Sequence, residues 1–528
     1  MKNKLFGTSL TLATLLGVAM GAASCGGPKV DPYSVDLSID PTGAHITMWH
    51  PFGLDVGAEL EKVIDDFQKE TGIRVTVESR EGYDNLKKAV ALAASGRKYP
   101  NVTVGYPDHF VEYVDSDIIV RLDYYLENDK DCIPLKEQVY EIAESDFYSS
   151  YMIENKSIEY DEEGDPYILG IPFNKSTEVM TYNKTLMTYL NSLDEDIVVP
   201  STWQQVRTVG QKMITKMNEI AQSGNLVIAY DSTNKVFTRV ATIQDIKDPY
   251  RLYLDLSDST FDVTKFRPIS YDSLANFFIT ELRNWGSEYT TVDKDTRQGY
   301  LAFYENNTKE KTKEMMQFFR DLYADGILGV PKTWEESKYS SNPFKNCLVG
   351  MMVGSTAGVT NSVATGNKFS VDAAPVPFNE ENNGKKYVIS QGTNLCLLDK
   401  GSEKQRVASW VLLKYLAKYA NGLFCANTGY FPSCEFAQNS EDYQDMLNKP
   451  TSRATPAEIL LKNTAAVNTN TYMPEANLWE KFVDAPFTGS ASIREDVKEI
   501  VNNMLFSDAS FDTILTNFYT SHASYVRK

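Results

Sequence analysis

Apolar residues between positions 45 and 106 recur first at the spacing of a strand and then at the spacing of a helix. Ile46 and Met48 alternate with their neighbours, as residues on one face of a sheet do. Val63 and Phe67 lie four residues apart and therefore share one face of a helix. Continued along the segment, the pattern predicts strands over residues 45–50, 73–77 and 101–104, separated by helices over residues 60–70 and 83–94.

Such a β-α-β-α-β segment builds a parallel sheet, because right-handed crossovers bring its strands side by side. Ligands of open α/β sheets bind beyond the carboxyl ends of the strands. In this segment those ends carry polar and aromatic residues, namely Trp49, His50, Tyr83, Tyr106 and Asp108. We therefore expect a binding site at this edge of the sheet, with Trp49 packed in the core.

Strands and helices continue to alternate along the chain, which predicts the α/β class. Thr202 with Gln205 forms a capping box that predicts a helix over residues 203–222, and Thr333 with Glu336 predicts a second helix start. Residues 231–307 show the least regular pattern, so we expect loops with helical pieces there. Further strands are predicted over residues 167–171, 177–182, 348–353, 371–376, 386–389 and 395–398, and further helices over residues 110–125, 311–324, 403–420 and most of 454–528.

The first 25 residues have the pattern of a secretory signal. Lys2 and Lys4 precede a largely apolar run over residues 5–20, and small residues then lead to Cys25. The run resembles a bacterial lipobox, in which the cysteine is lipidated and becomes the mature N-terminus. The alternative is an ordinary signal-peptidase cut after Ser24. With the lipobox, residues 1–25 are the signal and residues 26–43 a flexible tether to the membrane.

The net charge excludes one class of partner, and the cysteines allow two interpretations. The chain has 528 residues and a formal net charge of −19, which argues against nucleic acid as a partner, because nucleic-acid binding requires a basic surface. Five cysteines follow Cys25, and none forms a C-x-x-C pair. Buried thiols are the simplest interpretation, and a Cys425–Cys434 bridge is the alternative in an exported protein.

Motifs for catalysis are absent from the sequence. There is no H-E-x-x-H, G-x-S-x-G or G-x-G-x-x-G. The stretch from Gly326 to Thr333 has a P-loop spacing, but Pro331 occupies the position where a glycine amide should hold phosphate. We therefore expect no catalytic residue, no metal and no cofactor, although a secreted glycosidase or phosphohydrolase remains an alternative class.

Several short blocks, in this order and spacing, resemble the extracellular solute-binding proteins (family 1) of bacterial ABC sugar importers. Within that family the nearest likeness is to glycerol-3-phosphate-binding proteins. The resemblance implies two α/β lobes of the type II periplasmic-binding-protein fold, with the ligand between them. One lobe would comprise residues 44–174 with 385–432, and the other residues 175–384 with 433–528. The blocks are residues 46–50, 82–83, 171–177, 182–184, 350–357 and 427–432, with the two Thr-Trp pairs.

The resemblance also implies a set of ligand-contacting residues. Positions that contact ligand in the relative carry Tyr83, Ser176, Ser355, Gly392 and Tyr430 here. The relative's acidic contact falls at a proline, with Asp108 beside it as a substitute. Its phosphate-binding arginine falls near Thr469, where no basic residue stands, so a neutral saccharide is expected. The complete set of expected ligand-binding residues is Tyr83, Asp108, Ser176, Ser355, Thr356, Gly392, Asn394 and Tyr430.

The expected function is therefore capture of a neutral mono- or oligosaccharide and its delivery to ABC permease subunits by lobe closure. The expected protein is a monomer, anchored through Cys25 at the cell surface or in the periplasm. Two alternatives remain open at this point. One is binding of glycerol-3-phosphate or a glycerophosphodiester, and the other is a surface adhesin built on the same scaffold.

Overall fold

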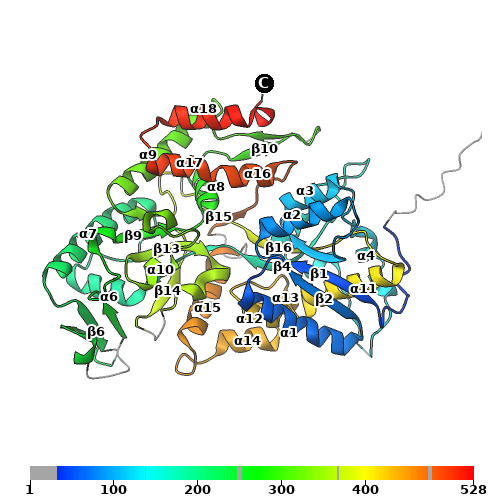
Figure 1. Ribbon diagram of the computed structural model, residues 1–528, viewed down its shortest axis with the longest axis horizontal. Helices are drawn as coiled ribbons and strands as arrows, with labels where there is room; N and C mark the ends of the chain where they lie inside the picture. The colour runs from blue at the N-terminus through cyan, green and yellow to red at the C-terminus, as the bar shows by residue number, and fades with distance from the viewer. Residues whose placement is uncertain are drawn as a thin grey trace, which may run out of the picture.

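The computed structural model describes residues 33–136, 138–231, 233–246, 252–293, 295–364, 368–473 and 478–527. The predicted signal, the lipidation site Cys25 and the first part of the tether lie outside these residues. The described chain forms two α/β lobes, each built on a five-stranded sheet (Figure 1). No helix in the described ranges is both long and apolar enough to cross a membrane.

The sheet of the first lobe has the order β2-β1-β3-β16-β4. β1 pairs in parallel with β2 and β3, whereas β16 runs antiparallel to both β3 and β4. The predicted β-α-β-α-β segment is therefore confirmed, and a strand from far along the chain completes its sheet. The bounds are β1 His45–His50, β2 Arg74–Ser79, β3 Val102–Gly105, β4 Ile171–Ser176 and β16 Gln391–Leu397.

The helices of the first lobe bury apolar stripes against this sheet. In α1, Leu60, Ile64 and Phe67 are buried, and Gly72 ends the helix with a φ of 73°, the left-handed cap that glycine adopts without strain. α1 begins at Leu54, whereas the predicted helix began at residue 60. The bounds are α1 Leu54–Thr71, α2 Tyr83–Ala94, α3 Pro107–Asp115, α4 Asp123–Glu127, α5 Ser149–Met152, α11 Glu403–Lys414, α12 Asn421–Ala426, α13 Glu435–Gln438 and α14 Glu441–Asn448.

The sheet of the second lobe has the order β12-β9-β13-β5-β14. β13 lies at its centre, parallel to β9 and antiparallel to β5. Its first six residues are buried, which matches the continuous apolar run that predicted this strand. The bounds are β5 Glu178–Asn183, β9 Arg267–Tyr271, β12 Leu328–Gly329, β13 Val349–Ser355 and β14 Val371–Ala374.

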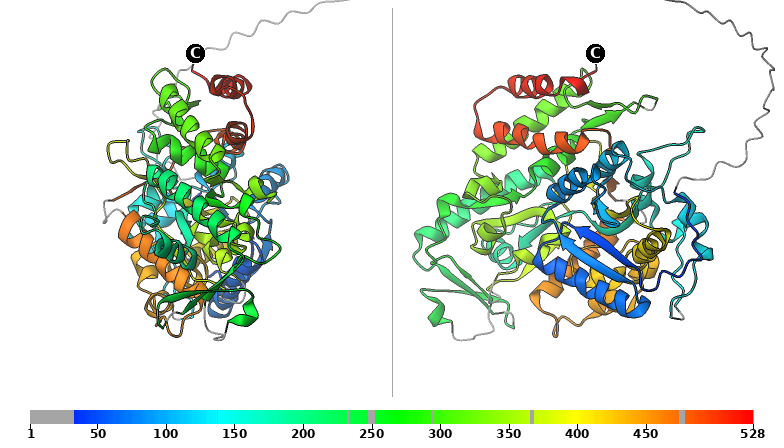
Figure 2. Two further views of the ribbon diagram at one scale, coloured as in Figure 1. Left: turned by 90° about the vertical axis from the view of Figure 1, so that its left-hand side faces the viewer. Right: turned by 45° about the vertical axis from the view of Figure 1, so that its right-hand side comes forward.

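Helices cover the second sheet, and the C-terminal pair α17 and α18 packs together at one end of the lobe (Figures 1 and 2). The Thr202 hydroxyl accepts a hydrogen bond from the Gln205 amide, so the predicted cap opens α7. The bounds are α6 Lys184–Leu193, α7 Trp203–Gln222, α8 Leu274–Asn284, α9 Lys309–Ala324, α10 Ser341–Lys345, α15 Pro456–Val467, α16 Ser490–Asp496, α17 Lys498–Phe506 and α18 Phe511–Ser521.

Several expectations for local structure were wrong, among them a single helix over residues 110–125, where α3 ends at Asp115 and α4 begins at Asp123. Residues 231–307 hold strands as well as the helix α8, because short apolar runs such as Arg267–Tyr271 are buried as sheet. Residues 390–394, which separate the strands predicted over 386–389 and 395–398, lie almost entirely within β16. The expected helix at Thr333 is one 3-10 turn over Pro331–Trp334. The small sheets contain β6 Val227–Asp231, β7 Val236–Val240 and β8 Leu252–Asp255, then β10 Thr290–Val292 with β11 Gly299–Leu301, and β15 Tyr387–Ile389 with β17 Glu480–Phe482.

The chain passes between two separate hydrophobic cores three times. It leaves the first sheet after Ser176 and returns to it at Gln391. Ser176 therefore belongs to β4 of the first lobe, whereas the predicted boundary at residue 175 placed it in the second. Tyr443 still packs in the first core and Leu460 in the second, so the last passage follows α14 and not residue 432.

Candidate functional site

The first-lobe part of the candidate site is a cluster of tyrosines. The Tyr83 and Tyr430 hydroxyl oxygens lie 3.2 Å apart, and Asn174 Nδ2 donates to the Tyr83 hydroxyl at 3.3 Å. Tyr83 opens α2, Asn174 lies on β4, and Tyr430 lies in the turn after α12. The structure thus brings two predicted residues together and adds Asn174, the position at which the first segment of the first lobe was predicted to end.

Tyr106 completes the cluster. It directly follows β3, and its ring centroid lies 5.0 Å from that of Tyr83. Burial raises the pKa of its phenol, so Tyr106 is neutral and serves as a hydrogen-bonding group. Its place at the carboxyl end of a parallel strand was the signal in the sequence.

Gly392 and Asn394 lie on β16, in the part that pairs antiparallel with β4. Gly392 has a φ of 88°, and a Cβ atom there would lie 2.0 Å from the Asn174 carbonyl oxygen, so this position requires glycine. Asn394 is fully buried, donates to Glu154 Oε1 at 2.8 Å and accepts from Asn155 at 3.0 Å. Its amide therefore supports the interior of the first lobe and does not face the tyrosines.

The second lobe meets the tyrosine cluster at the end of β13, through Ser355 and Thr356. Ser355 is half-buried, whereas Thr356 is fully buried, and its amide donates to the Thr177 carbonyl at 2.9 Å. A Cβ atom on Gly429 would lie 2.2 Å from the Thr356 carbonyl oxygen. The turn that carries Tyr430 is thus in direct backbone contact with the second lobe.

A buried polar chain in the second lobe ends in an arginine. Tyr271 donates to Glu178 Oε2 at 2.5 Å, and Asn276 Nδ2 donates to Glu178 Oε1 at 2.8 Å. The Arg494 guanidinium donates to Asn276 Oδ1. Burial raises the pKa of Glu178 to about 7, while Arg494 opposes that rise. These residues come from β5, α8, β9 and α16, so no local motif in the sequence could have identified them.

Asp108, predicted from the resemblance, is the second residue of α3. Its Oδ1 atom is buried and accepts no hydrogen bond among the described residues. Arg494 and Asp108 both affect the pKa of Tyr106, which places them near the tyrosine cluster. We call the set Tyr83, Tyr106, Asp108, Asn174, Tyr430, Ser355, Thr356 and Arg494 the inter-lobe site.

A lysine lies near the position where the sequence lacked a cation. Thr469 is exposed, but the side chain of its neighbour Asn468 is reached by Lys481 of β17, whose Nζ atom donates to Asn468 Oδ1 at 2.6 Å and to the Tyr151 hydroxyl at 3.2 Å. Sequence spacing gave no sign of this, because twelve positions lie between the two residues. Lys481 of β17 therefore supplies a positive charge next to Asn468.

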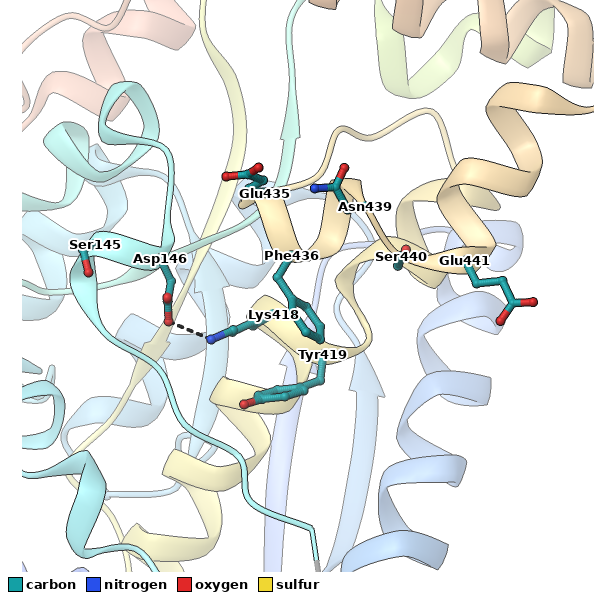
Figure 3. A pocket seen from close by; sticks show the side chains of 9 residues that line it. All are labelled: Ser145, Asp146, Lys418, Tyr419, Glu435, Phe436, Asn439, Ser440 and Glu441. Atoms are coloured by element: carbon teal, nitrogen blue, oxygen red, sulfur yellow. Dashed lines mark hydrogen bonds and ion pairs between the residues drawn. The ribbon is translucent and has the colours of Figure 1, made fainter.

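A surface depression of about 740 Å³ lies away from the inter-lobe site (Figure 3). It lies on the first lobe, where Lys418 Nζ is 2.8 Å from Asp146 Oδ2 and the rings of Tyr419 and Phe436 lie 5.3 Å apart. We place the candidate site between the lobes because side chains from both lobes converge there. The depression is lined by Ser145, Asp146, Lys418, Tyr419, Glu435, Phe436, Asn439, Ser440 and Glu441.

Among the described residues, neither a disulfide nor a metal site provides a second candidate for the functional site. Cys425 and Cys434 are both free thiols, so the bridge considered from the sequence is not formed. Within the described ranges, no group of three or more histidine, cysteine, aspartate or glutamate side chains could hold a metal ion.

Comparison with known proteins identifies relatives of the whole two-lobed chain. The family described as "Bacterial extracellular solute-binding protein" matches residues 62–451. A search of curated protein sequences finds no match.

Solved structures with the same fold include three sugar- or phosphodiester-bound proteins. The maltose/maltodextrin-binding domain MalE of Bdellovibrio bacteriovorus, bound to maltotriose, is 17% identical with a TM-score of 0.60, covering 92% of this chain and 100% of that one. The GacH receptor of Streptomyces glaucescens, solved unliganded and with acarbose, is 15% identical with a TM-score of 0.60, covering 92% and 98%. UgpB of Mycobacterium tuberculosis, with glycerophosphocholine, is 15% identical with a TM-score of 0.62, covering 91% and 98%. At these identities the likeness establishes the two-lobed fold.

Proposed function

Because this chain belongs to the bacterial extracellular solute-binding proteins, we propose that it captures a neutral mono- or oligosaccharide between its lobes. Closure of the lobes then presents the loaded protein to the permease subunits of an ABC importer. In this role the protein binds and releases its solute without catalysis, as a monomer.

The observation that carries the proposal is the tyrosine cluster at the lobe interface. Tyr83, Tyr106 and Tyr430 offer neutral hydroxyls and ring surfaces within one group. A sugar presents hydroxyls at its rim and C–H groups on its faces, so it suits a site that combines aromatic surface with a few placed polar groups. The maltotriose and acarbose complexes of two structural neighbours support the same solute class.

A second candidate is a glycerophosphodiester or glycerol-3-phosphate. Lys481, next to Asn468, supplies a cation at the end of the lobes where the resemblance expected a phosphate-binding arginine. The glycerophosphocholine complex of UgpB supports this candidate. The formal net charge of −19 opposes long-range attraction of an anion, so we rank it second.

The sequence at the N-terminus supports anchoring at the outer face of a membrane. Lipidation of Cys25 would hold the two lobes on a tether formed by residues 26–43. A tethered binding protein stays close to the permease, which raises the rate of repeated delivery.

Thermal unfolding of the purified mature chain tests the proposal. A solute that binds only the folded state raises the melting temperature by linkage. We expect a rise with maltotriose, cellobiose or xylobiose, and a smaller radius of gyration in small-angle scattering with the same sugar. A rise with glycerophosphocholine alone would transfer the assignment to the second candidate.

A further inference from the structure

Two oppositely charged side chains approach the tyrosine cluster from opposite lobes. Asp108 lies on α3 of the first lobe and Arg494 on α16 of the second, and these two helices pack against each other. In Figure 1, α16 lies beside α2 and α3. Both charges affect the same two phenols, since each of them alters the pKa of Tyr106 and of Tyr289.

The Arg494 side chain is held in place by polar residues of its own lobe. Its guanidinium donates to Asn276 Oδ1, and the amide group of Asn276 donates in turn to Glu178 at 2.8 Å. This chain fixes the amide orientation, with its oxygen toward the cation and its nitrogen toward the carboxylate. A guanidinium has five N–H donors, and only the bond to Asn276 is formed within the described chain. Arg494 forms no ion pair there and is only half-buried.

Asp108 lacks a partner of its own. Its Oδ1 atom is buried without a hydrogen bond, and the nearest cationic candidate, His109 Nε2, is 3.9 Å away. Burial lowers the pKa of His109, so this imidazole is neutral, and 3.9 Å is too long for a hydrogen bond. A buried carboxylate oxygen that accepts nothing is costly unless something else donates to it.

We infer that Asp108 and Arg494 form a split clamp across the lobes, which binds adjacent hydroxyls of one sugar ring. Asp108 accepts from one hydroxyl, and Arg494 donates to the other. This inference rests on the proposed function and deepens it, because it assigns the residues that select a neutral polyhydroxylated solute. A phosphate or carboxylate would satisfy Arg494 but would be repelled by Asp108, whereas a diol satisfies both.

Calorimetric titration of the full mature chain with maltotriose, cellobiose and xylobiose tests the clamp, with glycerophosphocholine as the charged probe. Asp108→Asn and Arg494→Gln should each weaken binding of the sugar that the wild type binds by about 10- to 100-fold, the usual effect of losing a hydrogen bond to a charged group. Arg494→Lys should retain part of the affinity, because it keeps the charge. The affinity should change little between low and high salt.

Two neighbours provide matched controls. Asp115 lies two turns along the same helix and accepts from the Thr488 hydroxyl at 3.0 Å, so Asp115→Asn removes the charge from an inter-lobe contact without touching the clamp. Arg297 donates to the Ser157 carbonyl across the lobes, so Arg297→Gln is the control for Arg494. Both should bind the sugar within about threefold of the wild type, and thermal unfolding of every variant checks that it is folded.

The outcomes separate the clamp from the proposed function. If the wild type binds a sugar and Arg494→Gln and Asp108→Asn bind it equally well, the clamp is wrong and the function stands. If Arg494→Gln loses only glycerophosphocholine, Arg494 is an anion site and the clamp is wrong. If the wild type binds none of the three sugars, the proposed function fails, and the clamp fails with it.

Discussion

The hydroxyl oxygens of Tyr83 and Tyr430 lie 3.2 Å apart, although 347 positions separate the two residues in the sequence. One begins α2 and the other lies in the turn that presses against Thr356 of the second lobe. If solute binds at this pair, as we propose, its binding would be coupled to contact between the lobes.

Tyr430→Ala is expected to weaken sugar binding by about 1–3 kcal/mol, because it removes both a ring face and a hydroxyl. Tyr430→Phe keeps the ring, which stacks on Phe424 at a centroid distance of 5.9 Å, and should show a smaller loss. Calorimetric titration measures both affinities. Equal affinity of Tyr430→Ala and wild type would remove Tyr430 from the site.

Gly429→Ala should hold the lobes apart. The new Cβ atom would lie 2.2 Å from a backbone oxygen of Thr356, and such overpacking costs about 1–3 kcal/mol in the closed arrangement. Because the sugar binds the closed arrangement, its affinity should fall by a similar amount.

Small-angle scattering with saturating sugar should then give a larger radius of gyration for Gly429→Ala than for the wild type. Gly358→Ala is the control, since a Cβ atom there meets nothing nearer than 3.8 Å. Unchanged scattering for Gly429→Ala would mean that the turn can move aside without separating the lobes.

Glu178 should make stability depend on pH. Its pKa rises from 4.5 to about 7 in the folded chain, mainly through burial, so the folded state retains a proton that the unfolded state releases. The resulting stabilisation is fully present below pH 4.5 and is lost as the pH rises through 7. At about 1.4 kcal/mol per unit, the loss is about 3 kcal/mol.

Glu178→Gln should remove this part of the pH dependence. Urea unfolding between pH 4.5 and 7.5 gives the free energy of unfolding for both proteins. Asp272, whose pKa is raised by burial to about 6, contributes in the same direction but is present in both, so the difference isolates Glu178. Parallel pH profiles would contradict the assignment.

Cys25→Ser should release the protein from the membrane fraction without changing its affinity for sugar, because the predicted lipidation site precedes both predicted lobes in the sequence. Fractionation and labelling with a radioactive fatty acid measure the anchor. Unlabelled, soluble wild-type protein would show that the signal is cut at another position.

Local patterns were enough to predict much of the fold. The alternation in β1 and the apolar stripe of α1 each depend on residues close in sequence, and the Thr202 cap on α7 involves positions three apart. Local sequence patterns failed to predict segments whose secondary structure depends on contacts with residues far away in the sequence. Gln391 to Asn394 lie between two predicted strands, but they belong to β16 and pair with β4.

The candidate site was only half predictable for the same reason. Tyr83 and Tyr430 could be chosen because they stand at a helix start and in a turn, where functional residues concentrate. Arg494 and Asn276 become neighbours only when α16 packs near α8, because they are 218 positions apart in the sequence. The hydrogen bonds of Asn394 with Glu154 and Asn155 could not be predicted either, because about 240 positions separate these residues in the sequence.

The position of β16 in the first sheet has a consequence for biosynthesis. Because β16 lies between β3 and β4, a growing chain that has passed residue 176 still lacks the strand that joins those two. The first lobe can close its core only after the polypeptide through Leu397 has been made. Contacts of such long sequence separation form slowly, so the first lobe would still be incomplete when the predicted signal at the N-terminus leaves the ribosome.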